Sequence, residues 1–275
     1  LYEKAMPADF SYEEKLQCAK SYGFDYVELS IDETDEKLSR LDASDQEKHL
    51  LIDAMYRTNF FFRSLCLSAH RRYPLGSHDA SIRARSLDIM QKAIHLASFL
   101  GIRIIQLAGY DVYYETGTEK SRAFFLENVH RAVDMAAAAG VTLGFETMET
   151  SFMDTVEKAM QTVRHINSPY LGVYPDLGNL TNAAQTYGIS VDRDIAVGCG
   201  HIIAMHLKET VPGRYREVPF GCGHVDFSAG IQAAWRQGVR RFTVECWSTN
   251  PPAWNQEIAA AGTMMRALLD ACSSQ

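Results

Sequence analysis

The chain has 275 residues, of which 47% are hydrophobic, and it carries 27 lysines and arginines against 34 aspartates and glutamates. This length suits two modest domains or one large α/β barrel, and the apolar content excludes a disordered chain. The formal net charge of −7 argues against binding nucleic acid through a general basic surface. A small phosphorylated substrate is compatible with this charge, because a local basic pocket can lie inside an acidic protein.

The sequence does not indicate membrane insertion or export. The longest apolar stretches without Asp, Glu, Lys or Arg, 135–145 and 195–207, are shorter than the roughly 18 residues of a membrane-spanning helix. The first residues lack the apolar segment of a secretory signal. Six cysteines without any C-x-x-C pair predict reduced thiols and a cytoplasmic protein.

Short apolar runs alternate along the chain with longer helical patterns. Because most of the runs are almost continuously apolar, they are typical of parallel strands that are covered on both faces. The predicted strands cover 26–30, 61–68, 103–108, 142–147, 171–176, 202–208 and 241–247. The predicted helices between them include 11–22, 44–58, 79–100, 118–139 and 154–166.

A glycine separates helix from strand at several boundaries. Gly23, Gly101 and Gly140 each follow a predicted helix and precede a strand, and Gly238 ends a later helix in the same way. The chain begins without an initiator methionine, and we expect residues 1–3 to be the end of a first strand that is clipped at the N-terminus. Eight such βα units predict a single (β/α)8 TIM barrel over residues 1–275.

A doubly wound open sheet is the alternative α/β architecture. It is disfavoured because no G-x-G-x-x-G motif follows an early strand. The nearest match, at 221–226, lies late in the chain and has Asp226 in place of the third glycine. We therefore predict no nucleotide cofactor.

The last four predicted strands each end in a strong oxygen or imidazole ligand. In chain order these residues are Glu146, Asp176, His206 and Glu245. Taken singly, each has a structural interpretation as an ion-pair partner, a helix cap or a hydrogen-bonded core histidine. Together, three carboxylates on the C-terminal rim of one barrel would repel one another, and a divalent cation relieves that repulsion. The set predicts one divalent metal ion, with Zn²⁺ and Mn²⁺ preferred and Mg²⁺ as an alternative.

Several longer segments resemble a known family. They are 1–5 (LYEKA), 27–35 (VELSIDETD), 66–76 (CLSAHRRYPLG), 106–114 (QLAGYDVYY), 174–179 (YPDLGN) and 218–221 (VPFG). With the rim residues, they are similar to the xylose-isomerase-like barrels. Within those barrels, they are similar to the L-ribulose-5-phosphate (L-xylulose-5-phosphate) 3-epimerases of ascorbate and pentose catabolism, also called hexulose-6-phosphate isomerases. The resemblance spans the whole chain.

This resemblance implies metal-dependent 3-epimerisation of L-xylulose 5-phosphate to L-ribulose 5-phosphate through an enediolate. It implies that Glu146 and Glu245 are the acid and the base and also contact the metal, whereas Asp176 and His206 are ligands only. Related sugar epimerases commonly have a histidine where this chain has Asn179. We therefore expect Asn179 to bind substrate without transferring a proton.

Two groups of residues are candidates for binding the substrate's phosphate. The first group follows the third strand of the barrel and consists of Ser68, His70 and Arg71. The second group follows the seventh strand and consists of Lys208, Arg214 and Arg216. Lys4 and Glu28, at the ends of the first two strands, are expected to face the same cavity. Lys4 is a further candidate for substrate binding, and Glu28 is given no role.

Other functions stay open at the level of sequence. An aldose–ketose isomerase acting on a phosphorylated sugar would use the same metal and a similar enediol. A phosphodiesterase resembling abasic-site endonucleases would use a larger, His-rich metal cluster and a basic DNA surface, and the net charge of −7 counts against it. The paired glutamates count against a sugar-binding barrel without catalysis. Analogy with barrels that associate through their outer helices predicts a homodimer, with no nucleic-acid or membrane partner.

Overall fold

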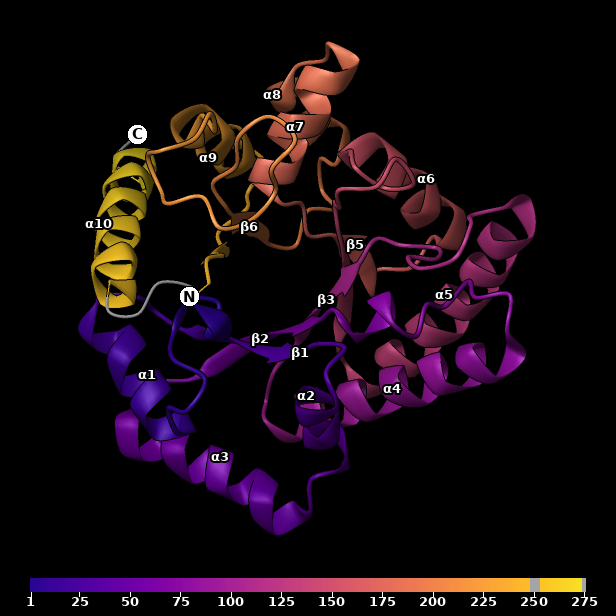
Figure 1. The fold of residues 1–275 in the computed structure, drawn as a ribbon, viewed down its shortest axis with the longest axis horizontal. Coiled ribbons are helices and arrows are strands. Elements are labelled where there is room, and N and C mark those ends of the chain that lie inside the picture. Colours follow the sequence, from indigo (N-terminus) through magenta and orange to yellow (C-terminus); the bar gives the residue numbers. More distant parts are fainter. Residues whose placement is uncertain (248–252, 274–275) are drawn as a thin grey trace.

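The computed structural model describes residues 1–247 and 253–273, which form a parallel α/β barrel (Figure 1). The strands are β1 (Val27–Ile31), β2 (Phe62–Leu67), β3 (Ile104–Ala108), β4 (Thr142–Glu146), β5 (Leu171–Val173), β6 (Met205–Leu207) and β7 (Phe242–Val244). Strands β1 to β5 pair in parallel in chain order, and β6 pairs in parallel with β7. Two isolated parallel bridges, Val173 to Ile202 and Asp176 to His206, connect β5 with β6.

The first two residues close the ring of strands. Tyr2 forms a parallel bridge to Glu28 on β1, and its backbone N–H donates to the carbonyl of Val244 on β7 at 2.9 Å. Leu1 and Tyr2 therefore occupy a strand position between β1 and β7, the place that a closed barrel requires. The predicted TIM barrel is confirmed.

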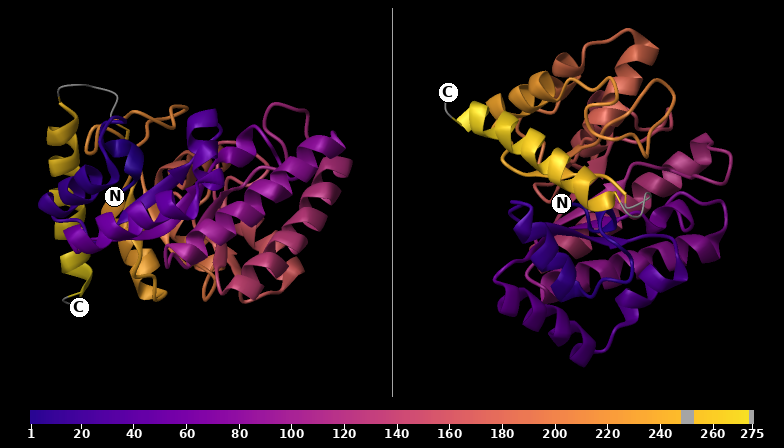
Figure 2. Two further views of the ribbon diagram at one scale, coloured as in Figure 1. Left: turned by 90° about the horizontal axis from the view of Figure 1, so that it is seen from below. Right: turned by 60° about the vertical axis from the view of Figure 1, so that its left-hand side comes forward.

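Helices surround the strands on the outside of the barrel (Figure 1). The α-helices of the described residues are α1 (Tyr12–Ser21), α2 (Asp35–Ser39), α3 (Asp45–Thr58), α4 (Ala80–Phe99), α5 (Glu119–Ala139), α6 (Val156–Ile166), α7 (Leu177–Tyr187), α8 (Val191–Val197), α9 (Phe227–Arg236) and α10 (Trp254–Ser273). Helix α10 lies beside the N-terminal segment (Figure 2), where Arg266 pairs with Asp25 at 2.6 Å. None of the described helices combines the length and apolarity needed to cross a membrane.

Local sequence explains where several helices begin and end. Ser11 and Ser44 each form a capping box with the glutamate three residues later, which satisfies backbone N–H groups at the starts of α1 and α3. Gly140 ends α5 in the left-handed conformation, with a φ of 65° that glycine adopts without strain. The predicted helix boundaries therefore agree with the structure to within about two residues.

The last three strands are shorter than the sequence predicts. Strand β5 ends at Val173 and β6 begins at Met205, whereas the apolar runs extend over 171–176 and 202–208. The side chain of Asp176 caps α7, so the backbone leaves the sheet before this residue. The early ends of β5 and β7 place Asp176 and Glu245 on the connections that leave the sheet.

Candidate active site

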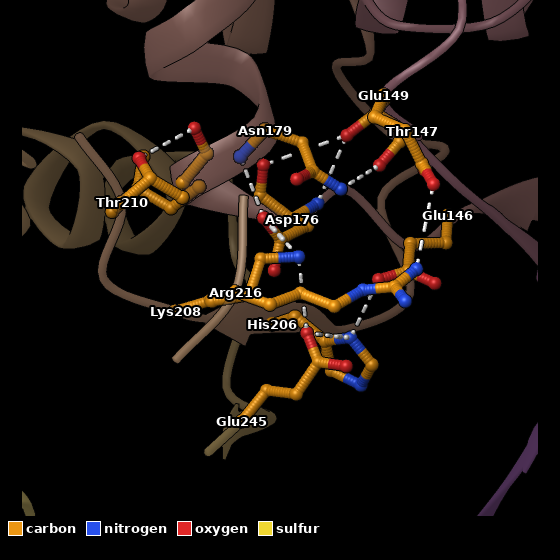
Figure 3. A network of polar contacts seen from close by, with 12 residues as sticks. Glu146, Thr147, Glu149, Asp176, Asn179, His206, Lys208, Thr210, Arg216 and Glu245 are labelled. Carbon is orange, nitrogen blue, oxygen red and sulfur yellow. Dashed lines mark hydrogen bonds and ion pairs between the residues drawn. The ribbon is translucent and has the colours of Figure 1, made fainter. Parts of the chain in front are cut away.

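Four potential ligands converge at the C-terminal ends of the last strands (Figure 3). Glu146 ends β4, Asp176 begins α7 after β5, His206 lies on β6, and Glu245 follows β7. All four are buried, and one ligand atom from each lies within 4.8 Å of the others. The structure thus brings together the four residues that the sequence placed at strand ends.

Asp176 is held by hydrogen bonds to its own turn. Its Oδ1 accepts from the backbone N–H of Asn179 at 2.6 Å, and its own N–H donates to the hydroxyl of Thr147 at 3.0 Å. The side-chain amide of Asn179 donates to the carbonyl of Thr147 at 2.7 Å. These contacts fix the turn between β5 and α7, and with it the direction of the Asp176 carboxylate.

His206 lies between carboxylates on both sides of its ring. Nδ1 is 3.0 Å from Oε1 of Glu146 and 3.5 Å from Oε2 of Glu245, whereas Nε2 is 2.6 Å from Oε1 of Glu28. Burial alone would lower the pKa of His206, but the charges of Glu28, Glu245 and Glu146 raise it well above its ordinary value. The neighbouring carboxylates therefore favour the protonated imidazole.

Lys208 is a second buried cation beside the cluster. Its ammonium lies 3.3 Å from Oδ1 of Asp176 and 3.3 Å from Oε2 of Glu245. Burial disfavours the charged form, yet Asp176, Glu245 and Glu146 raise the pKa of Lys208. The ammonium consequently stays positive and offsets part of the carboxylate charge.

The carboxylates differ in their affinity for protons. Burial and the charge of Glu245 raise the pKa of Glu146, and burial raises the pKa of Asp176 to about 7 against the opposing charge of Lys208. Burial acts in the same direction on Glu245, but Lys208 and His206 lower its pKa below the ordinary value. The site contains more buried acid than its own cations neutralise.

The chemistry of this cluster fits a divalent metal ion. Oδ2 of Asp176 is buried and has no hydrogen-bond partner. An unsatisfied buried carboxylate oxygen is costly unless something binds it. Three carboxylates and one imidazole form a donor set suited to Zn²⁺, Mn²⁺ or Mg²⁺.

A cavity opens beside the two glutamates of the cluster. Its lining residues are Tyr2, Lys4, Cys66, Ser68, Arg71, Glu146, Met148, Glu149, Asn179, Lys208, Tyr215, Arg216, Glu245 and Trp247. Six of the predicted substrate-binding residues lie here, namely Lys4, Ser68, Arg71, Asn179, Lys208 and Arg216. The two groups proposed for phosphate binding therefore share one cavity.

Two predicted substrate-binding residues lie elsewhere. His70 is buried against α4, where its Nε2 lies 3.2 Å from the carbonyl of Ser86, and burial lowers the pKa of His70 to about 4. Arg214 donates to the carbonyls of Arg216 and Glu217 within its own loop, at 3.1 and 2.6 Å. Neither side chain is among those that line the cavity.

Loops that follow three different strands meet through Glu149. Its carboxylate accepts hydrogen bonds from the hydroxyls of Tyr110 and Tyr113. It also pairs with Arg216 at 3.4 Å (Figure 3). The guanidinium of Arg71 lies 5.0 Å from the centre of the Tyr113 ring. These contacts connect the basic residues of the cavity with an acidic residue that sequence reasoning left out.

Two further polar residues inside the barrel contact the cluster. Gln106 was missed by sequence reasoning, whereas Glu28 was expected to face the cavity and was given no role. Gln106 on β3 donates to Oε2 of Glu146, and Glu28 on β1 binds His206. A signal for both was present, because each is a polar residue in a short and otherwise apolar strand. Their partners come from distant strands, and the sequence alone does not say which residues they meet.

Comparisons with known proteins agree with this architecture. The sequence profile described as xylose isomerase-like TIM barrel matches residues 16–268. The chain is 43% identical to the L-ribulose-5-phosphate 3-epimerase UlaE of Escherichia coli O139:H28 (strain E24377A / ETEC) over 268 residues, which are 97% of this chain and 93% of that protein.

Solved structures of similar fold include sugar epimerases. The crystal structure of D-allulose 3-epimerase from Methylomonas sp. has a TM-score of 0.78 and 19% sequence identity, covering 97% of this chain and 96% of that chain. A D-tagatose 3-epimerase-like protein has a TM-score of 0.79 and 13% identity, with coverage of 100% and 97%. At these identities the two structures establish the shared fold alone.

Proposed function

The chain belongs to the xylose isomerase-like TIM barrel family, and from this premise we propose that it interconverts L-ribulose 5-phosphate and L-xylulose 5-phosphate. These two sugars differ in configuration at C3, next to the C2 carbonyl. The observation that carries the proposal is the pair Glu146 and Glu245, two buried carboxylates that line one cavity in a chain similar to a 3-epimerase.

Epimerisation at C3 requires two proton transfers on opposite faces of the sugar. Loss of the C3 proton gives an enediolate, and a proton returned to the other face inverts the centre. Glu146 comes from the end of β4 and Glu245 from the end of β7, so the two carboxylates reach the cavity from separate strands. One removes the proton and the other supplies it, and their roles exchange when the reaction runs in the other direction.

Glu146, Asp176, His206 and Glu245 would hold the divalent metal ion. The metal would supply Lewis-acid stabilisation of the negative charge that develops on the substrate oxygens. Lys208 adds a fixed positive charge 3.3 Å from Glu245 and favours the ionised form of that carboxylate. Asn179, whose Oδ1 is buried without a partner, accepts a hydrogen bond from a substrate hydroxyl.

Ser68, Arg71 and Lys4 bind the phosphate in this proposal. The Nε of Arg71 is buried and has no hydrogen-bond partner, so it can donate to an anion in the cavity. Arg216 already pairs with Glu149, and Lys208 pairs with Asp176 and Glu245. Lys4 is likewise paired, with Asp32. The unused donor on Arg71 therefore favours the first of the two basic groups.

Isotope exchange tests the proposed reaction. Metal-loaded protein is incubated with L-ribulose 5-phosphate in D₂O, and the sugars are examined by NMR. We expect L-xylulose 5-phosphate with deuterium at C3 in both epimers. Deuterium at C1 with formation of an aldose would instead identify an aldose–ketose isomerase and overturn the proposal.

Carboxylate-to-amide variants test the roles of the two glutamates. Glu146→Gln and Glu245→Gln should each lower kcat by roughly 10³, within the range ascribed to a positioned acid or base. Glu127→Gln, an exposed residue on α5, is the matched control and should keep full activity. Full activity in either cavity variant would refute the two-carboxylate assignment.

A further inference from the structure

We propose that Glu28 is a positioning residue that holds the His206 imidazole with its Nδ1 directed at the metal site. Glu28 is outside the four-residue cluster and contacts the opposite nitrogen of the ring. The inference rests on the metal-binding part of the proposed function. According to this inference, Glu28 contributes to the affinity for the metal although it is not one of the four ligands.

Every oxygen of the Glu28 carboxylate has a partner. Oε1 is 2.6 Å from Nε2 of His206, and Oε2 accepts from the hydroxyls of Ser64 at 2.6 Å and Tyr174 at 2.8 Å. Both Glu28 and His206 have no exposed surface. Donors from three other parts of the barrel thus fix the carboxylate, and the carboxylate in turn fixes the ring.

These contacts decide which imidazole nitrogen carries a proton. Carboxylates only accept, so the doubly protonated ring donates from Nε2 to Glu28 at 2.6 Å and from Nδ1 to Glu146 at 3.0 Å. A metal ion held by the four-residue cluster would take the lone pair of Nδ1, and the remaining proton would then stay on Nε2, where Glu28 accepts it. Nδ1 is the nitrogen that lies 3.0 Å from Glu146 and 3.5 Å from Glu245.

Tyr174, which donates to Glu28, is itself held by further hydrogen bonds inside the barrel. The Tyr174 hydroxyl is also 2.9 Å from the hydroxyl of Thr243 on β7, which lies 2.9 Å from the hydroxyl of Tyr26. All of these hydroxyls are held between strands, in a region that most barrels fill with apolar side chains. This chain of hydroxyls gives Glu28 a fixed position relative to β7.

A purely structural ion pair would behave differently from a positioning residue. Loss of a structural pair would lower folding stability and leave the metal affinity of the folded protein unchanged. Loss of a carboxylate behind a ligating histidine typically weakens metal binding, because the ring loses its orientation and part of its basicity. Metal affinity of folded protein therefore separates the two roles.

The experiment compares metal-stripped wild type with Glu28→Gln. Both are titrated with Mn²⁺ and Zn²⁺ by calorimetry after circular dichroism has established that they are folded. We expect the Kd of Glu28→Gln to be about 10- to 100-fold weaker. In ¹⁵N NMR spectra at a pH where the ring is neutral, His206 should be the Nε2–H tautomer in wild type and a mixture of tautomers in the variant.

Asp194→Asn is the matched control. The Asp194 carboxylate is also buried, but it accepts from the backbone N–H groups of Val156 and Glu157, at 2.8 and 3.0 Å, and has no place in the cluster. Its variant should lose stability and keep the wild-type Kd for both metals. An unchanged Kd in folded Glu28→Gln would overturn the inference.

A double variant covers the case in which Glu28→Gln does not fold. Ser64→Ala with Tyr174→Phe keeps the carboxylate and removes two of its three donors, so the Kd should weaken by roughly threefold or more. An unchanged Kd would again overturn the inference. Because these titrations contain no sugar, wild type that binds metal but fails to epimerise would refute the proposed substrate and leave the role of Glu28 standing.

Discussion

Glu3 and Glu146 are both buried glutamates at the end of a strand position of the barrel, but their oxygens have different partners. The Glu3 carboxylate meets Lys15 at 2.9 Å, Lys37 at 3.2 Å and Arg40 at 2.8 Å, and it also accepts from the backbone N–H of Ser30. Around Glu146, two other carboxylates share the site with one histidine and one lysine.

The pKa values of the two glutamates differ accordingly. Burial would raise the pKa of Glu3, but the hydrogen bonds and charge of Arg40, with Lys15 and Lys37, hold it well below its usual range. For Glu146, burial and the charge of Glu245 act together and raise the pKa. A buried carboxylate surrounded by cations stabilises the fold. A group of buried carboxylates with too few cationic partners is instead suited to binding a cation.

The largest expected effect comes from Glu3→Gln. This change leaves three cations buried without their shared counter-charge, so the free energy of unfolding should fall by about 3–5 kcal/mol. Asp176→Asn is the matched change in the cluster, and it keeps a side chain that caps α7. In urea denaturation of metal-free protein at pH 7, Asp176→Asn should lose less than about 1 kcal/mol. Equal losses in both variants would remove the distinction between the two regions.

His70 is a second buried ionisable residue outside the cluster, and it should affect the pH dependence of folding stability. Its pKa is about 4 in the folded chain against an ordinary value of 6.5, so the unfolded state binds more protons between these pH values. The contribution of His70 to stability should therefore fall as the pH decreases from 6.5 to 4, by up to about 3 kcal/mol. Asp176, whose pKa is raised to about 7, acts in the opposite direction in both proteins, so the effect of His70 is read as a difference. Between pH 7.5 and pH 5, wild type should lose about 2 kcal/mol relative to His70→Gln in denaturation experiments.

His70→Gln also tests whether His70 binds substrate. Because the side chain bonds to Ser86 and does not line the cavity, KM at pH 7.5 should change by less than about twofold. A large increase in KM with unchanged stability would mean that His70 binds substrate after all.

Replacing Lys208 gives the smallest expected effect. It should change the affinity for the metal in the direction opposite to replacing Glu28. Its ammonium repels a divalent cation at the neighbouring ligands, so Lys208→Met should tighten metal binding by roughly tenfold, measured by calorimetry. The same variant should lower epimerase activity, because Lys208 lines the cavity. Lys208→Arg keeps the charge and should retain the wild-type Kd, and weaker binding in Lys208→Met would contradict this account.

The sequence was most informative where an apolar strand pattern ends in a residue that can bind a metal. Apolar strands with an acid or histidine at the end predicted Glu146, Asp176, His206 and Glu245, because parallel strands of a barrel bring their C-terminal ends to one rim. The direction of Lys208 was harder to predict. It was considered for the phosphate, yet its ammonium lies within the carboxylate cluster, a result of packing between β6 and β7.

Contacts between distant strands were beyond sequence reasoning. Glu28 stood in an apolar run and was expected to face the cavity, but nothing in the sequence shows that it faces the far nitrogen of His206. His70, in contrast, was expected in the cavity and lies outside it. Its segment follows the predicted strand, but a short 3₁₀ turn at Ala69–Arg71 directs the imidazole toward α4 while Arg71 reaches the cavity.

The contact between Glu28 and His206 spans 178 positions of sequence and joins the two halves of the barrel. All four ligands lie on or after β4, whereas Glu28 and Ser64 lie on β1 and β2. A chain divided between α5 and β4 would give one fragment with the complete ligand set and another that carries the support for its histidine. Mixing the fragments should restore tight metal binding only as they assemble, so bound metal would report the completion of folding as well as readiness for catalysis.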